Sequence, residues 1–209
     1  MIIRKEYLEQ LRQWQDEKII KVITGIRRCG KSTLLKEFQE LLIEQGISEK
    51  QIISINFEDL AYEELQDYKK LYKYIEKRII PEKPIYIFLD EIQKVEQFEK
   101  VVDSLHIKDN VDVYITGSNA FLLSGELATL LSGRYIEINM LPLSFREYVE
   151  ATDNENSDEE FRDYLQYGGM PYSVTLGKNQ NQIDTYLEGI YNTILIKDIE
   201  ERSIRKESD

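Results

Sequence analysis

An eight-residue segment, Gly25–Ser32, constrains this chain more than any other part of its sequence. Its residues, Gly-Ile-Arg-Arg-Cys-Gly-Lys-Ser, match the phosphate-loop pattern Gly-x-x-x-x-Gly-Lys-Ser at every position. The β-branched, apolar run Ile19–Thr24 precedes it, as expected of a buried strand, and several leucines and Phe38 follow it at helical spacing. A strand, a glycine loop and a helix in this order bring backbone N–H groups and a helix N-terminus to a phosphate. The segment therefore predicts a nucleoside triphosphate site.

The residue types in this loop assign a role to each position. Gly25 and Gly30 allow unusual dihedral angles and let the backbone approach phosphates without a Cβ in the way. Lys31 is expected at the β- and γ-phosphates, Ser32 at Mg²⁺ and Thr33 at the α-phosphate, and the lysine is expected to be exposed without a ligand. The rest of the predicted nucleotide-binding set lies between the glycines: Ile26, Arg27, Arg28 and Cys29. For the two arginines, packing on the surface or an ion pair with an acidic neighbour is favoured over a contact with phosphates.

A second motif follows the continuous apolar run Ile85–Leu89, which ends in Asp90 and Glu91. A strand that is apolar on both faces belongs inside a sheet covered by helices, and its C-terminal end lies where open α/β sheets bind ligands. Asp90 suits the Mg²⁺ shell through water, because Mg²⁺ retains several waters and takes few carboxylates. Glu91 suits a base that orients and polarises an attacking water. The alternative is a pair of solvated strand-end charges; beside a P-loop, the motif favours hydrolysis.

A third strand with a polar end is predicted at Val111–Thr116, and Gly-Ser-Asn follows it. A polar group at the end of a strand beside the P-loop strand can hold the lytic water or the γ-phosphate. Ser118 and Asn119 both have the required chemistry, and Asn119 is the preferred catalytic candidate. Either residue is also an ordinary helix N-cap, and one residue can serve both purposes.

Five segments that together characterise one family occur in order along the chain: Thr24–Ser32, Ile55–Asp59, Phe88–Gln93, Thr116–Asn119 and Leu131–Arg134. In this combination the chain resembles the AAA+-type ATPases of bacteria and archaea that carry a C-terminal domain of nuclease-like fold. The resemblance extends through Tyr167–Pro171 and Asn192–Ile199 to about Glu201. Such proteins usually continue well beyond this length, so the resemblance implies that the C-terminal domain is absent here.

The resemblance also gives Arg134 a candidate role. AAA+-type proteins often place an arginine at this point to complete a neighbour's active site, where it neutralises charge on the transferring phosphoryl group. Arg134 is therefore a candidate arginine finger, in trans or in cis, and the trans role implies a homo-oligomer. The alternative is a surface arginine that begins a strand. The resemblance further implies ATP as the nucleotide and a protein partner or the missing domain as the recipient of its action.

Charge and apolar patterning restrict the other functions of the chain. The net charge of −12 opposes a general role in coating nucleic acid, because phosphate neutralisation needs clustered Lys and Arg. The basic segment Lys69–Arg78 is better explained as the solvated face of an amphipathic helix. No apolar stretch has membrane-spanning length, and the N-terminus does not resemble a signal peptide. We therefore expect a cytoplasmic protein with no membrane association.

Strands that alternate with helices predict an α/β fold of the P-loop NTPase type, a three-layer αβα sandwich. Its parallel five-stranded sheet is expected to have the spatial order 2-3-4-1-5, which is typical of the resembled class. Helices are expected at about 5–14, 31–45, 65–79, 98–105 and 121–131, and Ser144–Glu147 is a capping box for a further one. Residues 1–150 are assigned to the ATPase domain and 151–209 to a helical lid or linker, with an exposed loop over 152–160.

Three functions are compatible with these motifs. The favoured one is Mg²⁺-dependent hydrolysis of ATP to ADP and phosphate, which drives or signals a conformational change. An ATP-dependent switch or scaffold with negligible hydrolysis is the first alternative. A P-loop kinase is the second, and it is less favoured because Asp90 and Glu91 fit water activation better than transfer to an acceptor.

Overall fold

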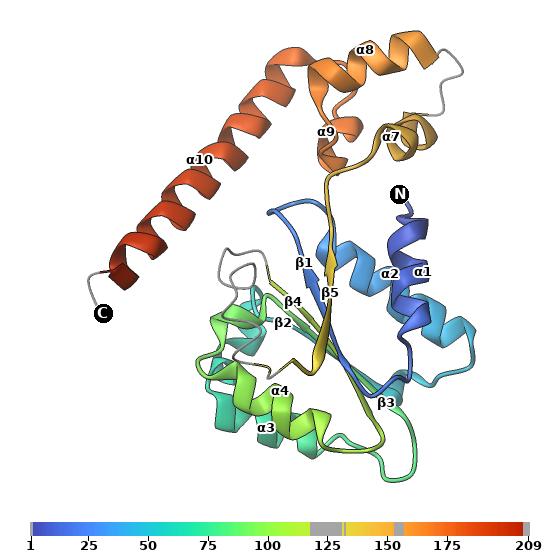
Figure 1. Cartoon of the computed structure of the whole chain (residues 1–209), viewed down its shortest axis with the longest axis vertical. Coiled ribbons are helices and arrows are strands. Elements are labelled where there is room, and N and C mark those ends of the chain that lie inside the picture. The colour runs from blue at the N-terminus through green and yellow to red at the C-terminus, as the bar shows by residue number, and fades with distance from the viewer. Residues whose placement is uncertain (1, 118–130, 132, 153–156, 207–209) are drawn as a thin grey trace. The chain divides into compact units, whose positions relative to one another are not determined.

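The computed structural model describes residues 2–117, 131, 133–152 and 157–206 (Figure 1). Its contacts group the chain into two units, which we call the sheet unit (3–25 and 31–140) and the helical unit (26–30 and 141 onward). The strands of the sheet unit are β1 (Ile20–Thr24), β2 (Ile52–Asn56), β3 (Ile85–Asp90), β4 (Val111–Thr116) and β5 (Tyr135–Asn139). Its α-helices are α1 (Lys5–Gln13), α2 (Lys31–Glu44), α3 (Tyr68–Glu76) and α4 (Phe98–His106). Single 3-10 segments are η1 (Glu49–Gln51), η2 (Leu60–Gln66) and η3 (Ile92–Lys94).

The five strands form one sheet in the order β2-β3-β4-β1-β5, and all four pairings are parallel. This confirms the predicted order 2-3-4-1-5. The register pairs Leu89 with Ile115 and Ile23 with Thr116, so the C-terminal ends of β3, β4 and β1 lie side by side. Because β4 separates the other two, its last residue is adjacent to both.

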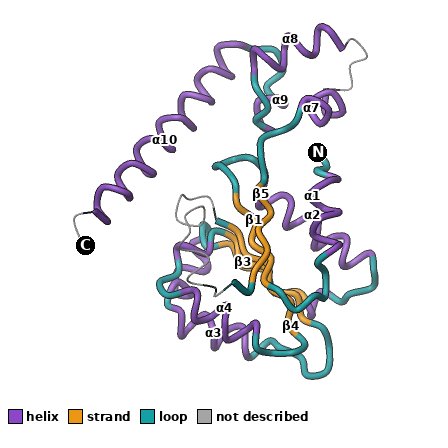
Figure 2. The backbone as a smooth tube through the Cα atoms, in the orientation of Figure 1, coloured by secondary structure: helices purple, strands orange, loops and turns teal. Residues whose placement is uncertain are grey.

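Helices cover both faces of the sheet, with α3 and α4 on one side and α1 and α2 on the other (Figures 1 and 2). On the first side, alternate strand residues such as Ile87, Val113 and Val22 pack in one apolar cluster with residues of α3 and α4. On the second side, Phe38 of α2 packs against Phe88 and Tyr114. Successive strand residues point to opposite faces of the sheet, so each strand contributes side chains to both sides. Helices on both sides confirm the predicted α/β fold.

A charged pair is buried on the α2 side of the sheet. Lys21 of β1 is 0% exposed and Asp112 of β4 is 7% exposed, and the Lys21 ammonium donates a hydrogen bond to Asp112 Oδ1. Asp112 Oδ2 also accepts hydrogen bonds from the Tyr114 hydroxyl (2.7 Å) and from the Asp16 N–H (2.9 Å). Burial lowers the pKa of Lys21 and raises the pKa of Asp112, and the attraction between the two charges opposes both shifts.

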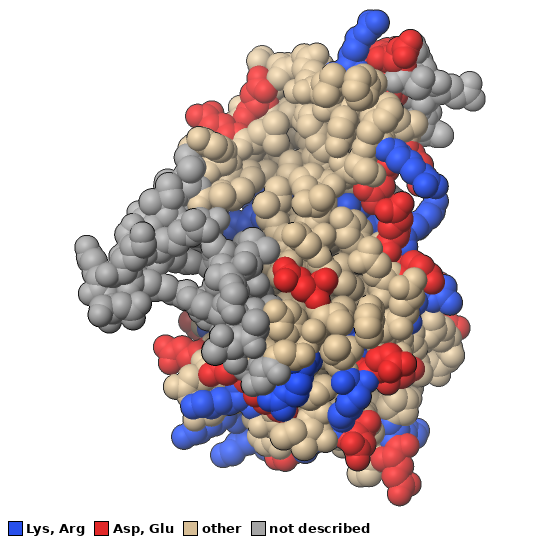
Figure 3. All heavy atoms as spheres, viewed as in Figure 1, with Lys and Arg blue, Asp and Glu red and all other residues tan. Residues whose placement is uncertain are grey.

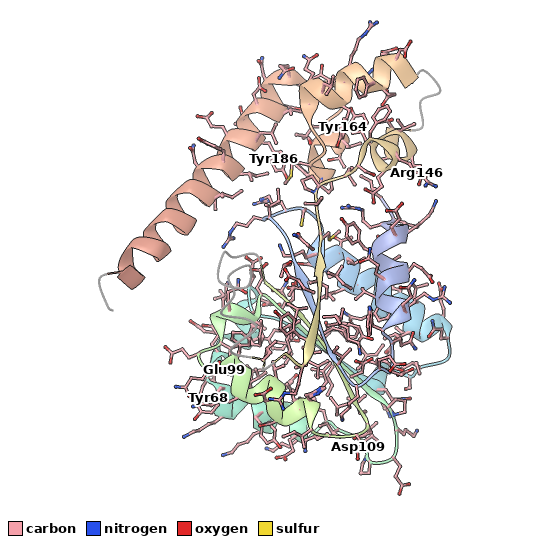
Figure 4. The ribbon with its side chains drawn as sticks, in the orientation of Figure 1. Tyr68, Glu99, Asp109, Arg146, Tyr164 and Tyr186 are labelled. Atoms are coloured by element: carbon pink, nitrogen blue, oxygen red, sulfur yellow. The ribbon has the colours of Figure 1, made fainter. Side chains whose placement is uncertain are left out.

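The helical unit begins with a cluster of aromatic side chains. Phe145 lies 5.2 Å from Phe161 and 5.6 Å from Tyr164, measured between ring centroids. The Tyr164 hydroxyl, labelled in Figure 4, donates to the Leu143 carbonyl at 2.8 Å. A Cβ at Gly169 would lie 2.4 Å from the same carbonyl oxygen, so this position requires glycine. The helices of this unit are α7 (Phe145–Thr152), α8 (Ser157–Tyr167), α9 (Pro171–Thr175) and α10 (Gln180–Lys206).

In the helical unit one sequence expectation is confirmed and another is wrong in part. The capping box forms as predicted, since the Ser144 N–H donates to Glu147 Oε2 at 2.9 Å and the Glu147 N–H donates to Ser144 Oγ at 3.4 Å. The expected exposed loop over 152–160 is wrong at its C-terminal part, because α8 begins at Ser157. Glu160 is 1% exposed there and accepts a 2.6 Å hydrogen bond from Thr152. The boundary proposed at residue 150 lies within α7, and the assignment of the two domains stays a prediction.

Candidate functional site: the C-terminal edge of the sheet

Three polar side chains meet where β3 and β4 end and α2 begins. Asp90 closes β3, Thr116 closes β4, and Ser32 is the second residue of α2. The Thr116 hydroxyl donates to Asp90 Oδ1, and the side chains of Ser32 and Asp90 are also hydrogen-bonded. Neighbouring parallel strands place their C-terminal residues at one sheet edge, so the strand order itself creates this cluster.

Asp90 is held in a nearly dry setting. It is 6% exposed, and Thr116 beside it is 0% exposed. Burial raises the pKa of Asp90, whereas the hydrogen bonds from Ser32 and Thr116 and the charge of Lys31 act in the opposite direction. A carboxylate oxygen and two hydroxyl oxygens are hard donors of the type that Mg²⁺ prefers. The residues present therefore fit a Mg²⁺ ion that retains several waters beside one carboxylate.

Lys31 is the first residue of α2, and its side chain is hydrogen-bonded to the first residue of the phosphate-loop motif. Its ammonium donates a 3.0 Å hydrogen bond to the carbonyl oxygen of Gly25, the first residue of the motif. The side chain is 4% exposed, so the expectation of a solvent-exposed lysine is wrong. Thr33, the next predicted contact, is exposed.

The backbone of the loop has the conformations that its glycines predict. Gly25 has φ 144° and Gly30 has φ 107°, both in the region that side chains disfavour. Arg28 also has a positive φ, 63°. Within the five residues between Gly25 and Lys31, the Cys29 N–H donates to the Ile26 carbonyl at 3.4 Å, and Cys29 is 0% exposed. Arg27 is half-buried and Arg28 exposed; their predicted contacts with phosphates stay predictions.

Glu91 has an unusual backbone conformation, and both its backbone N–H and its carboxylate form hydrogen bonds. Its φ of 57° and ψ of 46° are left-handed, a conformation that is uncommon for residues other than glycine. Its N–H donates to Thr116 Oγ1 at 3.0 Å, and its Oε2 accepts a 2.6 Å hydrogen bond from Gln93 Nε2. The side chain is 7% exposed, so Glu91 is not one of two solvated strand-end charges. Strained conformations of this kind concentrate at functional sites.

Thr116 links the two acidic residues, because its hydroxyl donates to Asp90 and accepts from the N–H of Glu91. We expect Thr116→Val to lower the free energy of unfolding by about 1–3 kcal/mol, since both groups lose a partner while they remain buried. Thr116→Ser keeps the hydroxyl and should lie near the original protein. Urea denaturation without nucleotide measures both variants, and equal stability of the valine and serine variants would contradict the bridging role.

Three further candidates were predicted from sequence: Ser118, Asn119 and Arg134. Ser118 and Asn119 lie outside the described residues. Arg134 directly precedes β5, which pairs with β1. Its carbonyl accepts a 3.0 Å hydrogen bond from the N–H of Ile20, the first residue of β1, so Arg134 lies beside the N-terminal end of that strand. The P-loop follows the end of β1, a five-residue strand that spans about 16 Å. Arg134 also forms a 3.0 Å ion pair with Asp103, and its role as an arginine finger stays a prediction.

Two residues of this site were not assigned roles from sequence. Thr116 was placed only as the end of a strand, and its signal was a hydroxyl at the C-terminus of a predicted interior strand. Gln93 carried no signal by itself, because the turn after Glu91 that brings its amide back cannot be inferred from spacing. In the described part of the chain there is no cluster of three or more His, Cys, Asp or Glu side chains suited to a metal ion.

Two further observations concern the distribution of charge on the surface and the apolar length of the helices. Lys and Arg side chains are interspersed with Asp and Glu on the face in view (Figure 3). The helices that the structure describes include none that is long and apolar enough to cross a membrane.

The sequence of this chain is similar to that of a known protein family and of two longer proteins. A family described as an AAA domain (AAA_14) matches residues 17–149. An uncharacterized protein of Haemophilus influenzae is 44% identical over 97% of this chain and 52% of its own length. MJ1544 of Methanocaldococcus jannaschii, also uncharacterized, is 33% identical over 89% of this chain and 43% of its own length. The chain thus spans about half the length of these relatives.

Solved structures extend the likeness to the fold. The Walker-type ATPase PABY2304 of Pyrococcus abyssi superimposes with a TM-score of 0.63 at 18% identity, over 100% of this chain and 77% of that one. The closed state of Hsp104 with ATPγS and FITC-casein superimposes with a TM-score of 0.54 at 18% identity, over 83% of this chain and 36% of that one. Because the AAA domain match covers more than half of the residues, the chain belongs to the AAA domain family and has its P-loop NTPase fold.

Proposed function

We propose that this chain binds ATP with Mg²⁺ and hydrolyses it to ADP and phosphate. The observation that carries the proposal is the hydrogen-bonded group Ser32, Asp90 and Thr116, which lies beside Lys31 at the C-terminal edge of the sheet. A phosphate loop alone supports binding, whereas a loop joined to a buried carboxylate and followed by Glu91 supports water activation. AAA domain membership supports ATP as the nucleotide.

Each residue of the proposed site has a separate task. Lys31 exchanges the Gly25 carbonyl for the β- and γ-phosphates, while Gly30 lets the loop backbone approach them. Ser32 and Asp90 would hold Mg²⁺, which supplies positive charge to the phosphate oxygens. Glu91 orients the attacking water and accepts its proton. The other predicted binding positions follow the path of the loop: Ile26, Arg27, Arg28, Cys29 and Thr33.

The finer parts of the proposal concern assembly and output. We propose that Arg134 acts toward a neighbouring copy in a homo-oligomer, the role that AAA+-type proteins often give an arginine at this point. We also propose that turnover changes the conformation of a protein partner or of a C-terminal domain of nuclease-like fold, in the cytoplasm. Sedimentation with and without Mg·ATP measures the oligomer directly.

We expect Lys31→Ala to weaken ATP binding by about 10- to 150-fold, because a charge-assisted hydrogen bond contributes about 1.5–3 kcal/mol. Titration of a fluorescent ATP analogue measures the affinity. Lys36→Ala, on the exposed face of the same helix, is the matched control and should bind as the original protein does. Circular dichroism checks that the fold is retained. Unchanged affinity of Lys31→Ala would refute the nucleotide site.

Phosphate release without any added acceptor separates the three candidate functions. Hydrolysis gives continuous release that depends on Mg²⁺ and is lost in Lys31→Ala. A switch with negligible hydrolysis gives binding without release. A kinase releases no inorganic phosphate; it forms ADP only when an acceptor is present, because the γ-phosphoryl group passes to that acceptor.

A further inference from the structure

Gln93 lies in η3, the single turn that follows Glu91, and its side chain folds back onto that residue. Its Nε2 donates a hydrogen bond of 2.6 Å to Glu91 Oε2. A hydrogen bond to an ionised carboxylate is charge-assisted, which makes it stronger than a bond between neutral groups. The backbone N–H of Glu91 is already bound to Thr116 Oγ1. Gln93 therefore restrains the carboxylate of a residue whose backbone is already held in place.

The other half of the Gln93 amide has a different environment. Its Oε1 atom is fully shielded and has no hydrogen-bond partner among the described residues. A buried amide oxygen without a donor is unfavourable, so it marks a place where a hydrogen-bond donor gives an energetic gain. One amide thus presents a donor that is used and an acceptor that is not, next to the proposed base.

We propose that Gln93 is a positioning residue for hydrolysis: its Nε2 orients the Glu91 carboxylate, and its Oε1 accepts a hydrogen bond from the water that Glu91 activates. This inference rests on the proposed ATPase function. In the step that it serves, the water oxygen bonds to the γ-phosphorus and its proton passes to Glu91. The bond to the bridging oxygen breaks, and ADP leaves with that electron pair. The amide orients these groups and transfers no proton.

Two variants of similar length separate orientation from shape. Gln93→Met removes both polar atoms, and Gln93→Glu keeps the shape but puts a carboxylate against Glu91. We expect kcat to fall by about 10- to 100-fold in Gln93→Met, in line with the cost of a misplaced catalytic group, while KM and ATP affinity stay within about threefold. Gln93→Glu should be at least as slow. Lys94→Ala, an exposed neighbour in η3, is the matched control and should keep the original kcat.

The opposite outcomes would overturn the proposal. A Gln93→Glu variant as active as the original protein would show that only the shape of the side chain matters. A higher kcat in Gln93→Met would show that the bond restrains Glu91 rather than orienting it. Equal loss of kcat and ATP affinity would indicate general damage to the site.

A readout without turnover tests the contact itself in the protein free of nucleotide. In ¹⁵N-labelled protein, the Gln93 side-chain amide is assigned by its loss in Gln93→Met. We expect one of its protons to be shifted downfield by the bond to the Glu91 carboxylate, and to return toward the range of exposed glutamines in Glu91→Ala. An unshifted signal in the original protein would refute the positioning contact.

Failure of this inference differs from failure of the proposed function. If the original protein releases phosphate, Glu91→Gln slows it and the Gln93 variants do not, only the inference is wrong. If the original protein releases no more phosphate than Lys31→Ala does, the proposed hydrolysis is wrong, and the role of Gln93 in it falls as well.

Discussion

Replacing Glu91 with glutamine is expected to slow ATP hydrolysis by about 100- to 10,000-fold while Mg·ATP affinity stays unchanged. The amide keeps the shape of the side chain and can still contact a water, but it cannot accept a proton. The Glu91 N–H remains bound to Thr116 in the variant, so the backbone at this position should not move. A single-turnover experiment with radiolabelled ATP measures the chemical step separately from binding.

The control for this prediction is Glu96→Gln, which removes an exposed carboxylate five residues further along the chain. It should hydrolyse ATP at the original rate. Were Glu91→Gln to show the same single-turnover rate as Glu96→Gln, Glu91 would not be the base. Ser118 and Asn119 would then be the next residues to test.

The second large effect concerns stability, because Lys21→Met leaves Asp112 as an unpaired buried charge. We expect the free energy of unfolding to fall by about 3–5 kcal/mol, the usual cost of removing one partner of a buried ion pair. Lys21 and Asp112 are 0% and 7% exposed, so water cannot readily replace the lost ammonium. Urea denaturation without nucleotide measures the change.

A double variant shows whether the loss comes from the unpaired charge. Lys21→Met with Asp112→Leu removes both charges, and we expect it to regain most of the stability, as apolar replacements of buried pairs often do. Lys36→Met, at an exposed position, should change the free energy of unfolding by less than about 0.5 kcal/mol. A Lys21→Met variant as stable as Lys36→Met would mean that the buried pair does not stabilise the fold.

The sheet could be predicted from sequence because its strongest signals are local. The P-loop fixes a strand, a turn and a helix within residues 19–45, and the apolar run before Asp90 fixes an interior strand. The strand order was expected from the resemblance together with Glu91 and the strand that intervenes between the P-loop strand and the Asp90 strand, and the structure confirms it. Once that order is known, Ser32, Asp90 and Thr116 are brought to the same edge of the sheet.

The side-chain contacts that complete the site could not be predicted in this way. The ion pair of Lys21 with Asp112 joins residues 91 positions apart, and it depends on the register that sets Lys21 opposite Tyr114. The bond from Gln93 to Glu91 depends on a left-handed backbone at a residue that is not glycine. In both cases the sequence contains the polar groups, but only tertiary geometry decides which of them meet.

The bond between the Lys31 ammonium and the Gly25 carbonyl affects how strongly this loop can hold a ligand. It joins the first glycine of the motif to the first residue of α2, so the loop is a closed ring before any phosphate arrives. A phosphate must therefore displace an existing partner of the lysine, and the affinity gained is the difference between two hydrogen bonds. In return, little chain entropy remains to be lost on binding, because the ring already restricts the path of the loop. ATP affinity in such a loop depends more on the exchange of the Gly25 carbonyl for a phosphate at Lys31 than on the entropy lost when the loop becomes ordered.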